Sequence, residues 1–248
     1  MSEWSIVLPV KSWASAKSRM LGLGFAERIT LVQALAEDTL RTIAEMPEVG
    51  RCFVVAPPDV LADLERRVGK RRFREVEDHA GGVGPDPLNS AFRQGCRAAL
   101  REGYHQVAMV VGDVPGLTAA GLRDFLRAVP ERLSAMMRDS PGSGTTILAS
   151  RLGDSLHPEF GPGSAERHAA AGAVDLTPRC DPSLSHDVDT MWDLWTARVV
   201  SGSLLDHWFR RWGAVPVASG EPRLRVPDQL RNAALDRNGQ PLGHGFGG

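Results

Sequence analysis

Apolar residues change their spacing along the chain, and this pattern predicts alternating strands and helices. Short apolar runs, each about five residues long, have the length of buried strands. Between them lie longer segments in which apolar residues recur at helical spacing. The predicted strands are 6–10, 52–56, 73–76, 106–111, 145–150 and 174–176. The predicted helices are 25–46, 59–68, 88–103, 118–133, 164–168 and 191–199. This alternation favours an α/β domain with a mainly parallel sheet flanked by helices on both faces.

Polar and proline residues between these segments suggest where the elements begin and end. Asp59 is the expected N-cap of the second helix, because its side chain can accept a hydrogen bond from the first turn. In 118–133 we expect a buried stripe that reaches Leu133, with Pro130 kinking the helix or dividing it in two. Residues 138–144 are the expected flexible connection to the next strand.

Three basic residues follow the first predicted strand. Lys11, Lys17 and Arg19 lie in the loop after 6–10, and a loop rich in cations and N–H donors at a strand end can hold phosphates. Any first strand of an α/β domain ends in a polar loop, so these residues alone leave a generic loop as the alternative.

Carboxylates form the second candidate group. Asp113 follows the most apolar predicted strand, and Asp187 and Asp189 precede the last predicted helix. If these segments meet over the carboxyl edge of the sheet, their oxygens suit Mg²⁺ and leave room for phosphate and water. The alternative is structural, with Asp113 shaping a turn and Asp189 capping its helix.

Composition favours one globular domain with a tail. The chain has 248 residues, of which 42% are hydrophobic, enough for a substantial core. We predict a domain at 1–219 and a polar, partly disordered tail at 220–248. An apolar and aromatic patch at 204–212 indicates either core or a subunit contact, so a homodimer is one arrangement that we expect.

Charge and cysteine usage exclude several classes of partner and site. A formal net charge of −1 gives no reason to expect nucleic acid or a membrane surface as a partner. No apolar run reaches the length of a membrane helix. The three cysteines lack the spacing of a disulfide framework or a zinc site, so we expect a cytoplasmic protein. The chain also lacks a Gly-x-Ser-x-Gly elbow and a Walker lysine motif.

Read in order, the motifs resemble a known family. They are LPVK followed by AKSR, an Asn-containing loop before a helix, a strand ending in Asp-hydrophobic-Pro, TTIL, FGPGS-x-x-RH and DVDT-x-x-DL. This order resembles the 2-phospho-L-lactate or phosphoenolpyruvate guanylyltransferases of coenzyme F-420 biosynthesis, over about 6–194. The loop at 79–89 is longer than the compact Gly-Leu-Asn turn of that family.

The resemblance implies a GT-A-like, Rossmann-like nucleotidyltransferase fold. It implies transfer of GMP from GTP to a phosphorylated three-carbon acid, with Mg²⁺ as cofactor and pyrophosphate released. Phosphoenolpyruvate is the acid that we expect first, and 2-phospho-L-lactate, 3-phosphoglycerate and a phosphonate are alternatives. A nucleotide-binding protein without catalysis is an alternative of another class.

The resemblance also assigns roles to individual residues. The implied nucleotide-binding residues are Lys11, Lys17, Arg19 and Asn89, the last near the nucleoside. The implied catalytic residues are Lys17, Arg19 and Asp113, and the implied metal ligands are Asp113 with Asp187 or Asp189. The implied acid-binding residues are Thr146, Gly161 and Ser164, with Arg167 and His168 as weaker additions. Main-chain N–H groups at a helix start can receive a carboxylate or phosphate.

Overall fold

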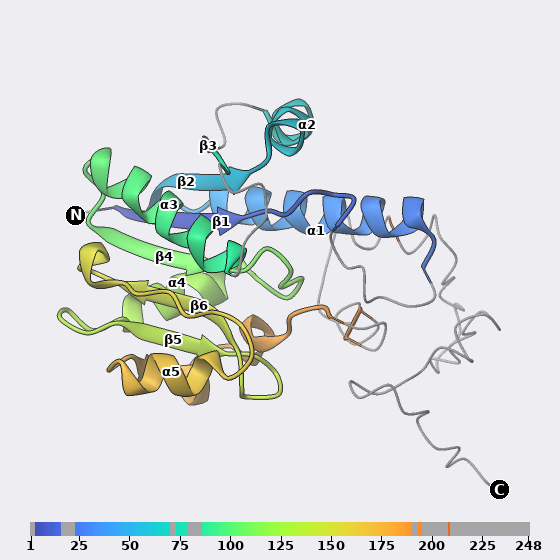
Figure 1. The fold of residues 1–248 in the computed structure, drawn as a ribbon. Helices are drawn as coiled ribbons and strands as arrows, with labels where there is room; N and C mark the ends of the chain where they lie inside the picture. The colour runs from blue at the N-terminus through green and yellow to red at the C-terminus, as the bar shows by residue number, and fades with distance from the viewer. Residues whose placement is uncertain are drawn as a thin grey trace, which may run out of the picture.

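A seven-stranded sheet organises the fold, in the order β3-β2-β1-β4-β6-β5-β7 (Figure 1). The computed structural model describes residues 3–15, 23–69, 73–78, 86–189, 193–194 and 208. The strands are β1 (Trp4–Pro9), β2 (Val49–Ala56), β3 (Arg74–Glu77), β4 (Gln106–Val110), β5 (Ala135–Arg138), β6 (Thr145–Ser150) and β7 (Val174–Asp175). The helices are α1 (Phe25–Ala44), α2 (Pro58–Val68), α3 (Pro87–Arg101), α4 (Ala119–Ala128) and α5 (Ser164–Ala170). Short 3-10 helices are η2 (Gly153–Ser155), η3 (Thr177–Arg179) and η4 (Pro182–Ser185).

The sheet is mainly parallel, as the sequence predicts. Strands β3, β2, β1 and β4 pair in parallel, whereas β6 runs antiparallel between β4 and β5. Strand β7 forms the edge and pairs with β5 in parallel. A short turn at 139–144 joins β5 to β6, and a connection that short permits only antiparallel pairing.

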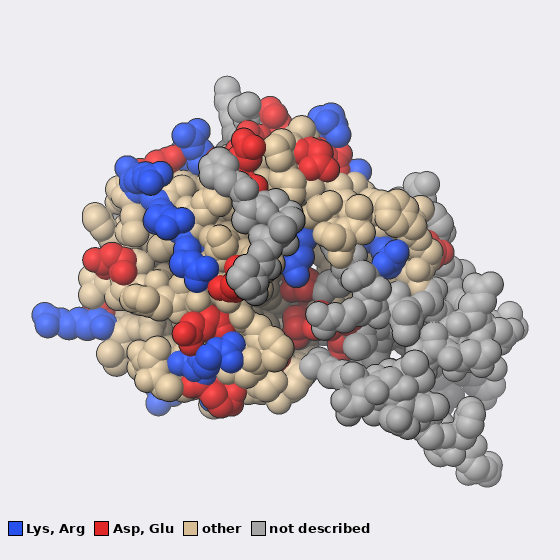
Figure 2. All heavy atoms as spheres, in the orientation of Figure 1, with Lys and Arg blue, Asp and Glu red and all other residues tan. Residues whose placement is uncertain are grey.

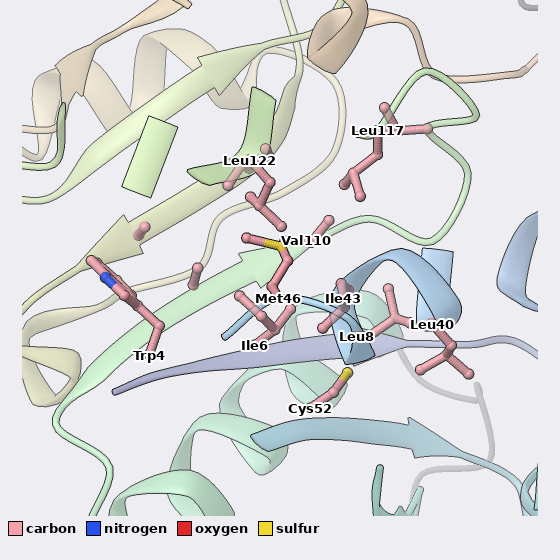
Figure 3. Close-up of a cluster of buried hydrophobic side chains, with 14 of the residues drawn as sticks. Trp4, Ile6, Leu8, Leu40, Ile43, Met46, Cys52, Val110, Leu117 and Leu122 are labelled. Atoms are coloured by element: carbon pink, nitrogen blue, oxygen red, sulfur yellow. The ribbon is translucent and has the colours of Figure 1, made fainter. Parts of the chain in front are cut away.

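Alternating side chains of the central strands fill two cores. Ile6 and Leu8 of β1 pack on the face covered by α1, α2 and α4, and Figure 3 shows the part of this core around them. Val7 points to the opposite face, where its core partners include Phe92 of α3 and Phe160. Because both faces are covered, the edge at the strand ends remains as the place for a site.

Helix α4 is shorter than the sequence predicts, and a strand was missed beside it. The helix ends at Ala128, and Val129 is extended with ψ 124° because a residue before proline disfavours the helical conformation. The predicted buried stripe is therefore wrong at Leu133, which is 51% exposed. Strand β5 follows, with the sequence AMMR. Alanine and methionine carry no local strand signal, so pairing with β6 and β7 decides its conformation.

Asp59 does not cap α2, which corrects another expectation. The N-cap is Pro57, and Pro58 opens the helix, where a missing N–H costs no hydrogen bond. Asp59 lies in the first turn, where a carboxylate interacts favourably with the helix dipole.

Several predicted segments lie wholly or mostly outside the described residues. They are the loop positions Lys17 and Arg19, most of the predicted helix at 191–199 and the tail at 220–248. None of the described helices is long and apolar enough to cross a membrane.

Candidate active site

The loops after β1 and β4 lie side by side at the carboxyl edge of the sheet. The two strands pair in parallel, so both end at this edge. Lys11 follows β1 and is exposed. Gly112 follows β4, and a Cβ built on it would lie 3.4 Å from the main-chain oxygen of Pro9. The loop that contains Asp113 therefore starts against the end of the strand that leads to Lys11.

Main-chain contacts join the two predicted acidic segments. The N–H of Val188, between Asp187 and Asp189, donates to the carbonyl of Asp113 at 2.9 Å. In Figure 2 acidic side chains lie on the side of the molecule where β1 and β4 end. We call residues 112–117 and 183–189 together the acidic wall. The structure brings Asp113 and the Asp187–Asp189 segment together, and their part in metal binding stays a prediction.

A second pair of contacts closes the acidic wall. The Ser183 hydroxyl donates to the carbonyl of Gly116 at 2.8 Å. A Cβ on Gly116 would lie 2.8 Å from the carbonyl oxygen of Ser183, closer than real Cβ atoms approach such an oxygen. Glycine at this position is therefore what lets the two segments touch.

The acidic wall fits a metal that substrate helps to hold. Within the described ranges, no three His, Cys, Asp or Glu side chains form a group that could hold an ion. Mg²⁺ commonly takes one or two protein carboxylates and completes its shell with substrate phosphates and water. Asp113 is half-buried beside a segment that carries two more carboxylates, so the donor set suits that mode of binding.

Thr146 fixes the acidic wall to the sheet. Met137 of β5 pairs with Ile147 and Arg138 pairs with Thr145, so Thr146 is an extra residue in β6, a bulge. Its hydroxyl donates to the carbonyl of Leu184 at 2.7 Å, and its carbonyl accepts from Val111 at 3.1 Å. Its predicted contact with the acid stays a prediction, since the ligand-free hydroxyl bonds to the main chain.

A turn rich in glycine lies on the other side of β6. We call residues 159–163 the glycine turn. Gly161 has φ 119° and Gly163 has φ 71°, a backbone region that glycine enters without strain. Among the described residues, no group accepts a hydrogen bond from the main-chain N–H of Gly161 or Gly163. The turn thus presents two donors, as an anion site requires.

Three buried side chains form a chain of hydrogen bonds behind the glycine turn. The Ser164 hydroxyl donates to Thr145 Oγ1 at 3.1 Å, and Thr145 Oγ1 lies 2.9 Å from His168 Nδ1. The N–H of Glu159 donates to His168 Nε2 at 3.0 Å. Because Nε2 accepts, the proton of the neutral ring is on Nδ1, which donates to Thr145. Ser164 is 0% exposed, so it supports the turn from beneath.

His168 is held in its neutral form. Its pKa is lowered from 6.5 to about 4, chiefly by burial and to a smaller extent by Arg167, with Glu159 acting in the opposite direction. The ring also makes an edge contact with Phe160, with centroids 5.2 Å apart. The imidazole is therefore a fixed part of the structure at neutral pH.

Asn89 pairs with the main chain of the glycine turn. Its Oδ1 accepts from the N–H of Phe160 at 2.7 Å, and its Nδ2 donates to the carbonyl of Phe160 at 3.0 Å. Nδ2 also donates to Asp86 Oδ1 at 2.7 Å. Both amide protons of Asn89 are in use, so Asn89 could contact the nucleoside only by accepting a hydrogen bond at Oδ1. That contact stays a prediction.

Some residues that build the site carry no recognisable sequence pattern. The motifs do not single out Thr145, Phe160 or Ser183, and they point only weakly to His168. The hydroxyl pair of TTIL was the available signal for Thr145. No local pattern could pair Ser183 with Gly116, because the contact spans 67 residues.

Comparison with known proteins first places the fold. A protein from Desulfovibrio desulfuricans described as a nucleotide-diphospho-sugar transferase has a TM-score of 0.63 at 18% identity, covering 86% of this chain and 99% of that one. A nucleotidyl transferase from Methanothermobacter has a TM-score of 0.51 at 17% identity, covering 85% and 100%. The chain has the fold of GT-A-like nucleotidyltransferases, as predicted.

Sequence relatives then define the family. A phosphoenolpyruvate guanylyltransferase from Sanguibacter keddieii is 35% identical, covering 84% of this chain and 86% of the relative. One from Streptomyces scabiei is 40% identical, covering 77% and 88%. No family model matches the chain. The chain belongs to the phosphoenolpyruvate guanylyltransferase family of enzymes, which confirms the resemblance seen in its motifs.

Proposed function

We propose that the chain transfers GMP from GTP to phosphoenolpyruvate, with release of pyrophosphate, in coenzyme F-420 biosynthesis. The observation that carries this proposal is the hydrogen bond from Val188 to Asp113. It joins two carboxylate segments at the sheet edge where Lys11 also lies. The names of the relatives support guanylyl transfer and this acid.

In this reaction a phosphate oxygen of the acid attacks the α-phosphorus of GTP. A new P–O bond forms, the bond from that phosphorus to the oxygen bridging to the β-phosphate breaks, and pyrophosphate leaves. The chemistry requires positioning and neutralised charge rather than a covalent nucleophile. Mg²⁺, held by Asp113 with Asp187 or Asp189, would neutralise charge on the triphosphate and the leaving pyrophosphate.

The remaining residues orient the two substrates. Lys11, with Lys17 and Arg19, would face the triphosphate, where cations offset its charge. The N–H groups of Gly161 and Gly163 would receive an anionic group of the acid. Thr146, on β6, and Ser164, beneath the turn, would also contribute to binding of the acid. The cytoplasm remains the compartment that we expect, because separate cysteines suit a reducing environment.

The test is pyrophosphate release by the purified protein. GTP and Mg²⁺ are incubated separately with phosphoenolpyruvate, 2-phospho-L-lactate and 3-phosphoglycerate, and with no acid as the control. We expect fastest release with phosphoenolpyruvate and loss of release when a chelator removes Mg²⁺. No release with any acid would contradict the proposal. Tight GTP binding that Asp113→Asn leaves unchanged would then indicate a nucleotide-binding protein.

A further inference from the structure

We propose that Asn89 and His168 are positioning residues that set the affinity for the acid without touching it. The inference rests on the proposed function, in which the glycine turn receives the acid. Asn89 belongs to α3 and His168 belongs to α5. Each holds a main-chain group of the glycine turn, at neighbouring residues.

Asn89 holds the turn at both main-chain groups of Phe160. The N–H of Phe160 can only donate and its carbonyl can only accept, so the amide of Asn89 has one orientation that satisfies both. Asn89 and Phe160 are 5% and 6% exposed. Losing this pair leaves buried main-chain groups without partners, which is costly enough to displace the turn.

His168 holds the turn one residue earlier. Its Nε2 accepts from Glu159, and its Nδ1 is anchored through Thr145 to β6. The ring of Phe160 lies between the two helices, stacked on Phe92 at 4.2 Å and in edge contact with His168. Thus α3, α5 and β6 together fix the residue that precedes Gly161.

The consequence for the acid lies in the direction of the donors. The backbone conformation of the preceding residues sets the directions of the Gly161 and Gly163 N–H groups, because glycine itself restricts its backbone dihedrals little. Without the two clamps the turn keeps the bonds from Arg167 to the carbonyls of Glu159 and Pro162, at 2.7 and 2.8 Å, but loses its hold on the N–H groups of Glu159 and Phe160. The donors then sample more directions before the acid binds, and binding must order them. We therefore expect weaker binding of the acid and unchanged binding of GTP.

Two substitutions at His168 separate its hydrogen bonds. In His168→Gln the side-chain oxygen can reach the Nε2 position and accept from Glu159. In His168→Asn the amide can replace Nδ1–H toward Thr145, but no atom reaches Glu159. We expect His168→Asn to raise the KM for phosphoenolpyruvate about tenfold and His168→Gln to stay within about twofold of wild type.

Asn89→Asp tests the other clamp and discriminates between its two roles. The substitution keeps the shape and the acceptor for the Phe160 N–H, but a carboxylate oxygen replaces the donor to the Phe160 carbonyl and to Asp86. A positioning role raises the KM for the acid, whereas a direct nucleoside contact raises the KM for GTP. Glu166→Gln is the matched control, since Glu166 lies on α5 and pairs with Arg138 at 2.9 Å, away from the turn. It should leave both KM values unchanged.

Hydrogen exchange provides a readout that does not depend on turnover. The amides of Glu159 and Phe160 should be protected in wild type and in His168→Gln, and Glu159 should lose protection in His168→Asn. The inference would be overturned if wild type, His168→Asn and Asn89→Asp had equal KM values for the acid and the amides stayed protected. That result would leave the proposed function untouched. Wild-type protein that releases no pyrophosphate with any acid would instead overturn the proposed function, and with it the role of the turn in acid binding.

Discussion

The two sides of the candidate site are held by different kinds of contact. In the acidic wall, two loops bind one another through a main-chain bond, from Val188 to Asp113, and through the Ser183 hydroxyl on Gly116. In the glycine turn, side chains from α3 and α5 grip the main chain of Glu159 and Phe160. The side-chain contacts behind the glycine turn can be removed one at a time by substitution. The main-chain bond in the acidic wall cannot, so substitutions there act through its glycines and carboxylates. With the proposed roles of the two sides, metal binding at the wall and acid binding at the turn, we expect substitutions of wall carboxylates to affect the chemical step and substitutions behind the turn to affect affinity for the acid.

The largest effect is expected for Asp113→Asn. The substitution keeps the main-chain contact with Val188 but removes a negative charge proposed to hold Mg²⁺. We expect kcat to fall on the order of 100-fold or more, with little change in the free energy of unfolding. Steady-state pyrophosphate release and urea unfolding measure the two quantities. Asp124→Asn, at an exposed position on α4, is the control, and a parallel loss of stability and activity would indicate a turn residue instead.

The glycine turn should carry a pH-dependent part of the stability through His168. Its pKa is about 4 in the folded protein against an ordinary 6.5, so the unfolded chain binds the extra proton between these values. The stabilisation is full above pH 6.5 and is lost as pH falls toward 4, by about 3 kcal/mol. When the free energy of unfolding is measured by urea at each pH across this range, it should change less with pH in His168→Gln than in wild type. An identical pH dependence of the free energy of unfolding in the two proteins would mean that the imidazole is not held neutral.

Gly116→Ala tests how tightly the acidic wall is packed. A Cβ would lie 2.8 Å from the Ser183 oxygen, so one of the two segments must shift. We expect the free energy of unfolding to fall by about 2 kcal/mol. Gly112→Ala is the comparison for stability, because its Cβ would meet Pro9 at 3.4 Å and can be accommodated. Equal stability of the two variants would show that the wall yields easily.

The smallest effect is expected for Ser164→Ala. It removes one buried hydrogen bond, to Thr145, worth about 1 kcal/mol. The KM for the acid should rise by a few fold, and the KM for GTP should not change. An effect confined to GTP would place Ser164 in a different pocket.

Sequence patterns predicted the framework and proposed candidate site residues, but they did not predict the long-range partners of those residues. The apolar run before Asp113 predicts β4 and its end correctly, and the order of motifs singles out Asp187 and Asp189 as candidate metal ligands, which stays a prediction. The contact of Val188 with Asp113 spans the whole of α4, β5, β6 and α5, and no periodicity encodes it. Asn89 illustrates the same limit, because an amide suits a base or a main chain equally well until its neighbours are known.

The neighbouring threonines of β6 give the site a mechanical property. Thr146 is bonded to Leu184 in the acidic wall, and Thr145 is bonded to Ser164 beneath the glycine turn. Consecutive Cα atoms are about 3.8 Å apart. The points at which β6 holds the two sides are therefore a fixed distance from each other. We therefore expect motion of β6 to displace the acidic wall and the glycine turn together, so that their separation changes little.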